Sequence, residues 1–132
     1  MIGKSNRFHG HNSLNPVYKM GQAFNDSQIS LKSIPARQGH AYRLAVVVSK
    51  KVDKSAVARN RIRRRIYEIV RLKSGQLKQP TDMVINVYND QAGKMKSEDL
   101  EKIIHGLLLK AGLLTGSKEL EHDIVDRQKE MS

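Results

Sequence analysis

The sequence contains no cysteine, no tryptophan and no long apolar run. The lack of cysteine excludes a disulfide framework, a thiolate metal site and a cysteine nucleophile. The longest apolar run, residues 44–48, is far shorter than the roughly 20 residues of a membrane-spanning helix. The first residues also lack the apolar stretch of a secretory signal. We therefore expect a soluble protein of the cytoplasm with no membrane partner.

Acidic residues are scarce, and the resulting charge is concentrated in one part of the chain. The 132 residues include 24 Lys and Arg against 13 Asp and Glu, which gives a net charge of +11. Residues 42–78 hold nearly all of it, because their acids are only Asp53 and Glu68. The basic residues of this stretch are Arg43, Lys50, Lys51, Lys54, Arg59, Arg61, Arg63, Arg64, Arg65, Arg71, Lys73 and Lys78. Such a focused excess indicates a face that binds a polyanion.

Three segments have the apolar spacing of helices. The first helix is expected to begin at a cap at Asn12 or Ser13 and to end at Gly21. The last is expected to begin at a cap at Ser97 and to end at Gly112. Pro16 is tolerated in the first turn of the first helix. The middle helix, residues 56–73, carries one apolar stripe, which predicts that it packs along one side.

Four segments have an extended pattern, at residues 23–24, 28–34, 42–49 and 82–88. Residues 36–40 are typical of a turn. The segment 42–49 is β-branched and continuously apolar, so we expect a central strand covered on both faces. The layout is α-β-β-β-α-β-α, an α/β (α+β) domain of residues 1–114 with one sheet packed against helices. Residues 115–132 form a charged tail.

The middle helix is rich in arginine and carries the functional argument. Its core stripe is Ile62, Ile66, Ile69 and Val70; the opposite side holds Asn60, Arg64, Tyr67 and Arg71, flanked by Arg61 with Arg65 and by Arg59 with Arg63. Each flanking pair of like charges costs about 0.2–0.5 kcal/mol, and Glu68 offsets only part of this through Arg64 and Arg71. A polyanion along the face removes the repulsion, and each guanidinium group can donate hydrogen bonds to two oxygens of a phosphate.

RNA suits this helix better than DNA, and an independent enzyme is not indicated. The chain lacks zinc-ligand spacing, heptads after a basic region and helix-turn-helix spacing, and it lacks the aromatic signature of the common RNA-recognition sheet. His9 and His11 have no neighbouring acids, so no metal site is expected. Asp82 and Asp90 flank a strand without converging, so no catalytic residue is expected in the protein itself.

Five motifs in order over residues 6–114 resemble the ribonuclease P protein family. The motifs are Arg7-Phe8; Val17-Tyr18-Lys19 with Gly21; Arg43 through Ser49-Lys50-Lys51-Val52; Arg59-Asn60-Arg61 with Arg63-Arg64 and Glu68; and Leu100 to Leu114. The resemblance implies a ribosomal-protein-like fold with a mostly antiparallel sheet and a left-handed βαβ crossover around the arginine helix. It also implies a ribonucleoprotein holoenzyme in which the RNA, with Mg²⁺ bound mainly by it, cleaves the 5′ leader from precursor tRNA. The protein alone is then inactive and needs no obligate protein partner.

The resemblance assigns roles to individual residues. The residues implied to contact the catalytic RNA are Arg59, Asn60, Arg61, Arg63, Arg64 and Arg71; those implied to line or border a leader cleft between the arginine helix and the sheet are Tyr18, Lys32, Ser49, Lys50 and Lys51. The chain departs from the family where Leu14 and Lys32 replace aromatic residues and Tyr67 replaces Arg, so leader binding relies more on charge than on stacking. A ribosome-associated or chaperone-like RNA-binding protein without enzymatic assembly is the alternative.

Overall fold

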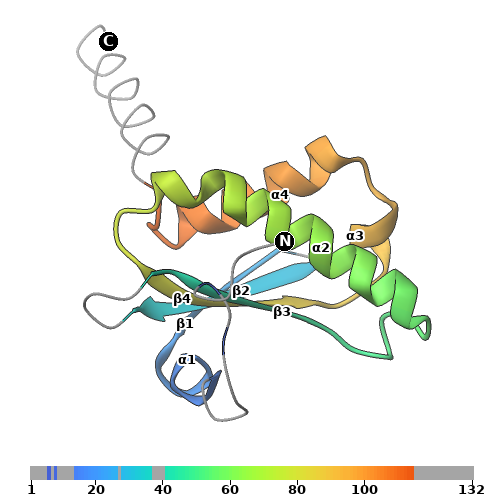
Figure 1. The fold of residues 1–132 in the computed structure, drawn as a ribbon, viewed down its shortest axis with the longest axis horizontal. Coiled ribbons are helices and arrows are strands. Elements are labelled where there is room, and N and C mark those ends of the chain that lie inside the picture. Colours follow the sequence, from blue (N-terminus) through green and yellow to red (C-terminus); the bar gives the residue numbers. More distant parts are fainter. Residues whose placement is uncertain (1–5, 7, 9–13, 27, 37–40, 115–132) are drawn as a thin grey trace, which may run out of the picture.

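The chain forms one four-stranded sheet with helices on both faces (Figure 1). The computed structural model describes residues 6, 8, 14–26, 28–36 and 41–114, so the predicted tail, His9 and His11, and most of the turn at 36–40 lie outside the described residues. The elements are α1 (Asn15–Met20), β1 (Gln22–Asn25), β2 (Ile29–Pro35), β3 (Arg43–Val48), α2 (Ala56–Lys73), the 3₁₀ turn η3 (Ser74–Gln76), β4 (Thr81–Val87), α3 (Gln91–Lys94) and α4 (Ser97–Lys110). The predicted order is confirmed, with η3 and α3 as additions.

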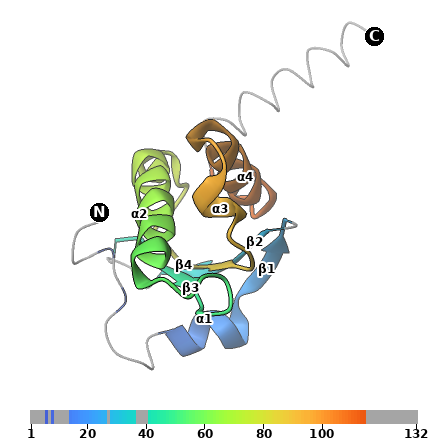
Figure 2. The same ribbon diagram turned by 90° about the vertical axis from the view of Figure 1, so that its right-hand side faces the viewer.

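The strand order is β1-β2-β4-β3. The pairs β1–β2 and β2–β4 are antiparallel, whereas β3 and β4 are parallel and are joined by α2. With α2 above the sheet, the chain passes from β3 to the strand on its left, so the crossover is left-handed (Figures 1 and 2). About 98% of crossovers between parallel strands are right-handed, so the left-handed crossover, which the resemblance implies, distinguishes this fold from most others.

The prediction that β3 is the central strand is wrong. β3 lies at an edge of the sheet and pairs with β4 alone among the described strands, whereas β4 is bonded on both sides. Burial along β3 alternates: Leu44, Val46 and Val48 are buried, and Ala45 and Val47 are half-buried. The residues of the second face are small and apolar, so the sequence of a half-covered edge strand resembles that of a fully covered one.

Helices α2 and α4 lie side by side on one face of the sheet (Figure 2). The core side chains of α2 are Ile62, Ile66 and Val70, and those of α4 are Leu100, Ile104, Leu107 and Leu108. They pack against the sheet residues Leu31, Val46 and Ile85. On the opposite face α1 covers part of the sheet, where Val17 and Val84 are completely buried. No helix of the described residues lies over the other end of that face (Figure 1).

The helix ends confirm some of the predicted bounds and correct others. α1 begins at Asn15 with Leu14 at its N-cap, so it starts later than predicted, and Asn12 and Ser13 lie outside the described residues. Gly21 ends α1 as expected, where its N–H donates to the Val17 carbonyl at 2.8 Å.

At α4 the predicted cap is wrong by one residue. Ser97 is the first helical residue and Lys96 takes the extended cap conformation. Neighbouring polar residues at a helix start make such shifts common. Gly112 ends the helix as predicted, because its φ of 71° lies in the left-handed region that glycine adopts easily.

Candidate RNA interface

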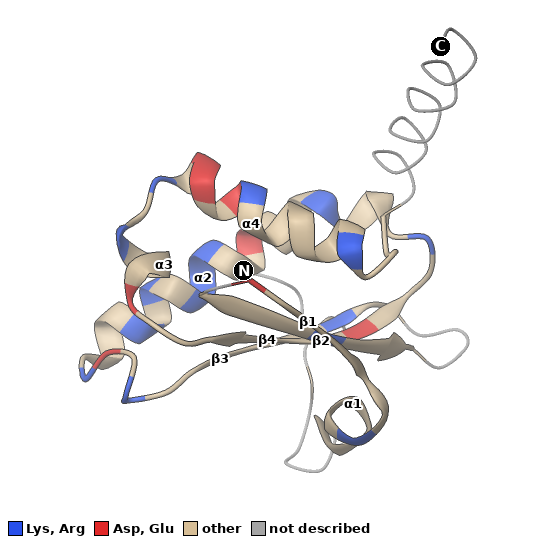
Figure 3. Ribbon diagram, turned by 180° about the vertical axis from the view of Figure 1, so that it is seen from behind, with Lys and Arg blue, Asp and Glu red and all other residues tan. Residues whose placement is uncertain are grey.

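Helix α2 is fixed along one side and charged along the other. Its N-cap is Ser55, whose hydroxyl accepts a hydrogen bond from the Ala58 N–H at 3.2 Å. The buried residues Ile62, Ile66 and Val70 then hold the helix on the sheet, as the stripe predicts, whereas Ile69 of the same stripe is only half-buried. Figure 3 shows basic positions at intervals along α2, whereas the acidic positions nearby belong mainly to the start of α4. The helix backbone is therefore fixed on the sheet, while its basic side chains extend from the opposite side.

Arg61 and Arg64 are the two exposed cations of this surface that the fold does not use. Neither forms a hydrogen bond or an ion pair with any residue in the described part of the chain. Arg64 stands between two open grooves, of about 500 Å³ toward α4 and about 400 Å³ on the side of Tyr67. Each guanidinium therefore keeps its donors for an external partner.

The other four arginines of the helix, Arg59, Arg63, Arg65 and Arg71, bond to their own chain. Arg59 donates to the carbonyls of Asp53 and Lys54, both at 2.9 Å, and so closes the loop before α2. Arg65 donates to the carbonyls of Ala92 at 2.7 Å and Met95 at 2.6 Å, which ties α2 to α3.

Arg63 donates to the side-chain oxygen of Asn60. This bond leaves the Asn60 amide nitrogen and the remaining guanidinium donors of Arg63 for other contacts. The pair lies beside Arg64, along the smaller of the two grooves. Helical spacing thus identified the arginines, but not which of them serve the fold.

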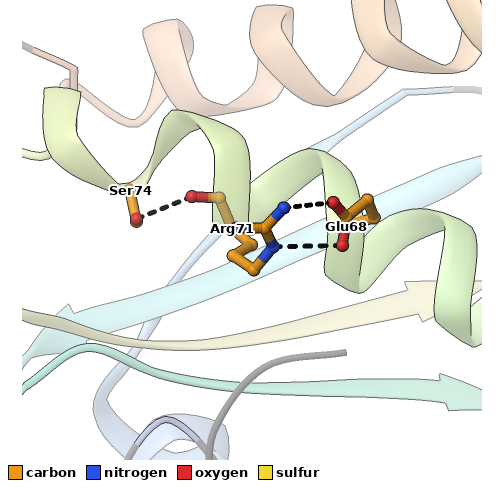
Figure 4. A network of polar contacts seen from close by, with 3 residues as sticks. All are labelled: Glu68, Arg71 and Ser74. Atoms are coloured by element: carbon orange, nitrogen blue, oxygen red, sulfur yellow. Dashed lines mark hydrogen bonds and ion pairs between the residues drawn. The ribbon is translucent and has the colours of Figure 1, made fainter.

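Arg71 is paired with Glu68, so one of the predicted RNA contacts meets an acid of the same helix (Figure 4). The Arg71 Nε donates to Glu68 Oε2 at 3.1 Å, and its Nη2 donates to Oε1. The Ser74 hydroxyl donates to the Arg71 carbonyl at 2.7 Å. These bonds lower the pKa of the Glu68 carboxyl and raise the pKa of Arg71. The pair stays half exposed, so Arg71 can still meet a phosphate. The sequence-based expectation that Glu68 also offsets Arg64 is not met.

Tyr67 does not point away from the core as expected. Its hydroxyl accepts a hydrogen bond from the Val46 N–H at 3.4 Å, and its ring packs against the core beside β3. An aromatic ring gains more from this half-buried place than from water, and helix α2 lies close enough to the edge strand to allow it. Tyr67 therefore lines the groove next to Arg64 with its ring while its hydroxyl is used by the sheet.

In the described part of the chain, the space between the arginine helix and the sheet, where the resemblance implies a leader cleft, is closed by packed side chains. The space between α2 and the sheet is filled by the side chains of Ile62, Ile66 and Val70 against Leu44 and Ile85, all of which are at most 2% exposed. A helix needs that contact to bury its apolar side, so no strand of RNA fits there. The residues assigned to the leader instead point to the other face of the sheet or to its end.

Tyr18 and Lys32 meet on the sheet face that α1 packs against, called the second face from here on. Lys32 follows the buried Leu31 in β2 and so projects away from the core. Its amine lies 5.5 Å from the centre of the Tyr18 ring and donates to the Tyr18 carbonyl at 3.4 Å. This cation–π contact holds the charge at the rim of α1, with Tyr18 itself 40% exposed.

Ser49, Lys50 and Lys51 lie in the exposed turn after β3, where the Ser49 carbonyl accepts from the Val52 N–H at 3.0 Å. In the register, Ala45 lies two strands from Lys32, and Ser49 is four residues further along β3. Strand geometry places Ser49 roughly 16 Å from Lys32. The structure thus divides the residues predicted to contact the leader into two separate groups rather than one pocket.

Arg43 belongs to the second face, although its charge is counted with the basic stretch. It forms a two-bond ion pair with the buried Asp82, at 3.0 and 2.7 Å, and lies 4.6 Å from the centre of the Phe8 ring. The hydrogen bonds to Asp82 raise the pKa of Arg43. Asn6 donates to the Tyr42 carbonyl at 2.8 Å, which fixes the N-terminal segment here. Register, not spacing, brings Arg43 and Asp82 together.

The described residues contain no group of three or more His, Asp or Glu side chains that could hold a metal ion. They also contain no helix with the length and apolar character needed to cross a membrane. Asp90 pairs with Lys94 at 2.9 Å, and Asp82 with Arg43. The described acidic side chains therefore do not form a Mg²⁺ site.

A basic helix fixed over a sheet by a left-handed crossover is an uncommon arrangement, and whole-chain comparison shows where it occurs. The family model described as Ribonuclease P matches residues 2–112. The chain belongs to the ribonuclease P protein family. A ribonuclease P protein component of Pseudanabaena sp. is 32% identical over 117 residues, which cover 89% of this chain and 100% of that protein. One of Clostridium acetobutylicum is 37% identical over 114 residues, which cover 84% of this chain and 92% of the other.

Solved structures of the family share the fold. The Staphylococcus aureus RNase P protein matches with a TM-score of 0.74 at 22% identity, over 85% of this chain and 100% of that one. The Thermotoga maritima protein matches with a TM-score of 0.62 at 21% identity, over 72% and 87%. As a member of the ribonuclease P protein family, the chain has the role of a protein component of the holoenzyme in tRNA 5′ processing. The comparisons favour this role over the chaperone-like alternative.

Proposed function

We propose that the exposed side of α2 binds the catalytic RNA of ribonuclease P, and that the opposite face of the sheet binds the 5′ leader of precursor tRNA. The observation that carries the first part is the pair Arg61 and Arg64, which are exposed on a helix fixed in the core and have no partner in the described residues. The planar guanidinium can donate two hydrogen bonds to one phosphate, so less side-chain freedom is lost for each bond formed.

The other predicted contacts contribute in different ways. Arg59 shapes the start of the helix, because one nitrogen of its guanidinium donates to the loop carbonyls of Asp53 and Lys54. Asn60 and Arg63 act as a bonded pair beside Arg64. Arg71 joins when a phosphate competes with Glu68 for its donors. The strongest contribution to affinity is therefore assigned to the middle of the helix.

The leader follows the second face from α1 toward the end of β3. Tyr18 and Lys32 offer a ring and a charge at one point of this path, and Ser49, Lys50 and Lys51 offer further donors near its other end. A single strand binds such a surface through its backbone charges and through stacking, worth about 1–3 kcal/mol per base. The small number of aromatic residues here makes the charge contribution the larger one.

The catalytic step belongs to the RNA, and Mg²⁺ is held mainly by that RNA. The protein contributes binding and neutralises RNA charge, so it lowers the concentration of divalent ion that the holoenzyme needs. No obligate protein partner is required, and the assembly works in the cytoplasm.

Reconstitution with the cognate catalytic RNA and a precursor tRNA at low Mg²⁺ tests the proposal. We expect the protein to stimulate removal of the leader, while the protein without RNA cleaves nothing. Failure to stimulate cleavage, with the RNA active alone at high Mg²⁺, contradicts it. A leaderless tRNA competitor separates the two surfaces: the second face should favour the precursor over the mature tRNA.

A further inference from the structure

One end of the second sheet face carries a row of polar side chains. Ser30 pairs with Asn25 on one side and with Asn86 on the other, so the three residues lie in a line across β1, β2 and β4. Their neighbours Leu31 and Ile85 point into the core, which places the row on the opposite face. This end of the sheet lies beyond the part that α1 covers.

Tyr88 meets this row in an unusual orientation. It follows β4, and its N–H donates to the Gln28 carbonyl at 2.9 Å, which extends the ladder by one step. Its hydroxyl shares a hydrogen bond of 2.7 Å with the hydroxyl of Ser30, a residue only 4% exposed, while Tyr88 itself is 58% exposed. A tyrosine ordinarily buries its ring and keeps its hydroxyl in water. Here the hydroxyl is held by the sheet and the ring faces solvent.

An exposed ring with a fixed hydroxyl is suited to stacking on a nucleobase, because its orientation costs nothing to acquire on binding. The Asn86 side chain next to it is half-buried and forms no hydrogen bond with other described residues. Its amide offers both a donor and an acceptor, the combination that reads the edge of a base. The ring supplies affinity for any base, and the amide supplies a preference.

We propose that Tyr88 and Asn86 form a base-reading site for one unpaired nucleotide of the leader. Tyr88 stacks on the base and Asn86 hydrogen-bonds to its edge, with Asn25 close enough to contact the same nucleotide. The inference rests on the proposed leader-binding role of this face and adds sequence selectivity to it.

The position of the site fits a strand that is also held by Lys32. Lys32 lies two residues from Ser30 along β2 and on the same face, which separates them by about 7 Å. A neighbouring phosphate of the same strand can therefore reach Lys32 while the base lies on Tyr88. The arginines of α2 project from the other side of the sheet and take no part in this site.

Binding of precursor tRNAs to the reconstituted holoenzyme tests the site. Leaders are varied to each of the four bases at one position at a time, and a leaderless tRNA is the reference. Tyr88→Ala should weaken binding of every leader-bearing substrate about tenfold and leave the leaderless tRNA unchanged. Tyr88→Phe, which keeps the ring and loses the bond to Ser30, should weaken it less.

Asn86→Ala should remove the preference at the one leader position that the wild type discriminates. Gln91→Ala, an exposed amide on α3, is the matched control and should behave as the wild type. Thermal unfolding of each variant confirms that it is folded.

The outcomes separate the inference from the function that it rests on. If the wild-type holoenzyme binds leader-bearing and leaderless tRNA equally, the protein does not bind the leader, and the proposed function of this face is contradicted. A wild type that favours the leader, with Tyr88→Ala and Asn86→Ala unchanged at every position, overturns the base-reading site alone. No discrimination at any position in the wild type, or a loss in Tyr88→Ala that is as large on leaderless tRNA, also overturns it.

Discussion

The α2 side of this protein carries two exposed arginines without a partner among the described residues, whereas on the other face of the sheet the cations in β2 and β3 each have one. On the α2 side, Arg61 and Arg64 are exposed and have no partner among the described residues. On the other side, Arg43 is bound to Asp82 by two hydrogen bonds, and Lys32 lies over the ring of Tyr18. A cation that the fold neutralises stabilises the fold, whereas one left exposed on a rigid helix is available to a polyanion. The contrast assigns structure to Arg43 and binding to Arg61 and Arg64.

Both faces depend on the same core, and breaking it should affect both. Ile66 is completely buried between α2 and the sheet, so Ile66→Ala should lower the free energy of unfolding by about 2–5 kcal/mol. Urea denaturation measures the loss. RNA and leader binding should fall together as the temperature approaches the lowered Tm. A variant as stable as the wild type would show that α2 is not fixed by this contact.

The structural cation on the sheet side is tested through its acid. Asp82→Ala leaves the guanidinium of Arg43 without its partner at a site where the Asp82 side chain is only 6% exposed. We expect the free energy of unfolding to fall by about 1–3 kcal/mol. The exposed pair Asp90–Lys94 provides the control, because Asp90→Ala should change it by less than about 1 kcal/mol. Equal effects of the two substitutions would contradict a structural role for Arg43.

The exposed cations of α2 should show the reverse behaviour. Arg64→Ala and Arg61→Ala should each weaken binding to the catalytic RNA and reduce the slope of log affinity against log salt by about one unit. Stability should be unchanged, or slightly higher in Arg61→Ala because the repulsion with Arg65 is removed. Lys110→Ala, an exposed charge at the end of α4, is the control. A loss of stability without a change in the salt slope would reverse the assignment.

Arg71 lies between these two kinds of cation, and the smallest effect is expected there. Hydrogen bonding to Arg71 lowers the pKa of Glu68, so the pair stabilises the protein above the ordinary carboxyl pKa and loses that contribution as the pH falls through the lowered value. In Arg71→Ala, the pKa of Glu68 should return upward in an NMR titration of its carboxyl carbon. Glu68→Gln should slightly strengthen RNA binding by releasing Arg71. An unchanged pKa would show that the pair does not form in solution.

The sequence predicts those parts of the molecule that local patterns determine. The stripe Ile62, Ile66, Ile69 and Val70 predicted α2 and its buried side, although Ile69 is only half-buried, and residues 59–64 predicted the basic surface. Gly21 and Gly112 ended their helices because the chain cannot continue the helix there at low cost.

Contacts between distant segments could not be predicted in the same way. The apolar run of β3 does not distinguish an edge strand from a central one, because the strand order depends on the crossover. Helical spacing placed Tyr67 outward, although the nearby edge of β3 offers its hydroxyl a backbone partner. The bond between Tyr88 and Ser30 joins residues 58 positions apart, and only the register of β2 with β4 brings them together.

The separation of the two faces can be measured directly with two double variants. The dissociation constants for the catalytic RNA alone, and for precursor tRNA against leaderless tRNA in the holoenzyme, are compared for Arg61→Ala/Arg64→Ala and for Tyr18→Ala/Lys32→Ala. We expect the first variant to bind the catalytic RNA more weakly, and the second to bind it normally while losing the preference for the leader. Equal loss of catalytic-RNA binding in both variants would contradict the division of the molecule into two RNA-binding faces.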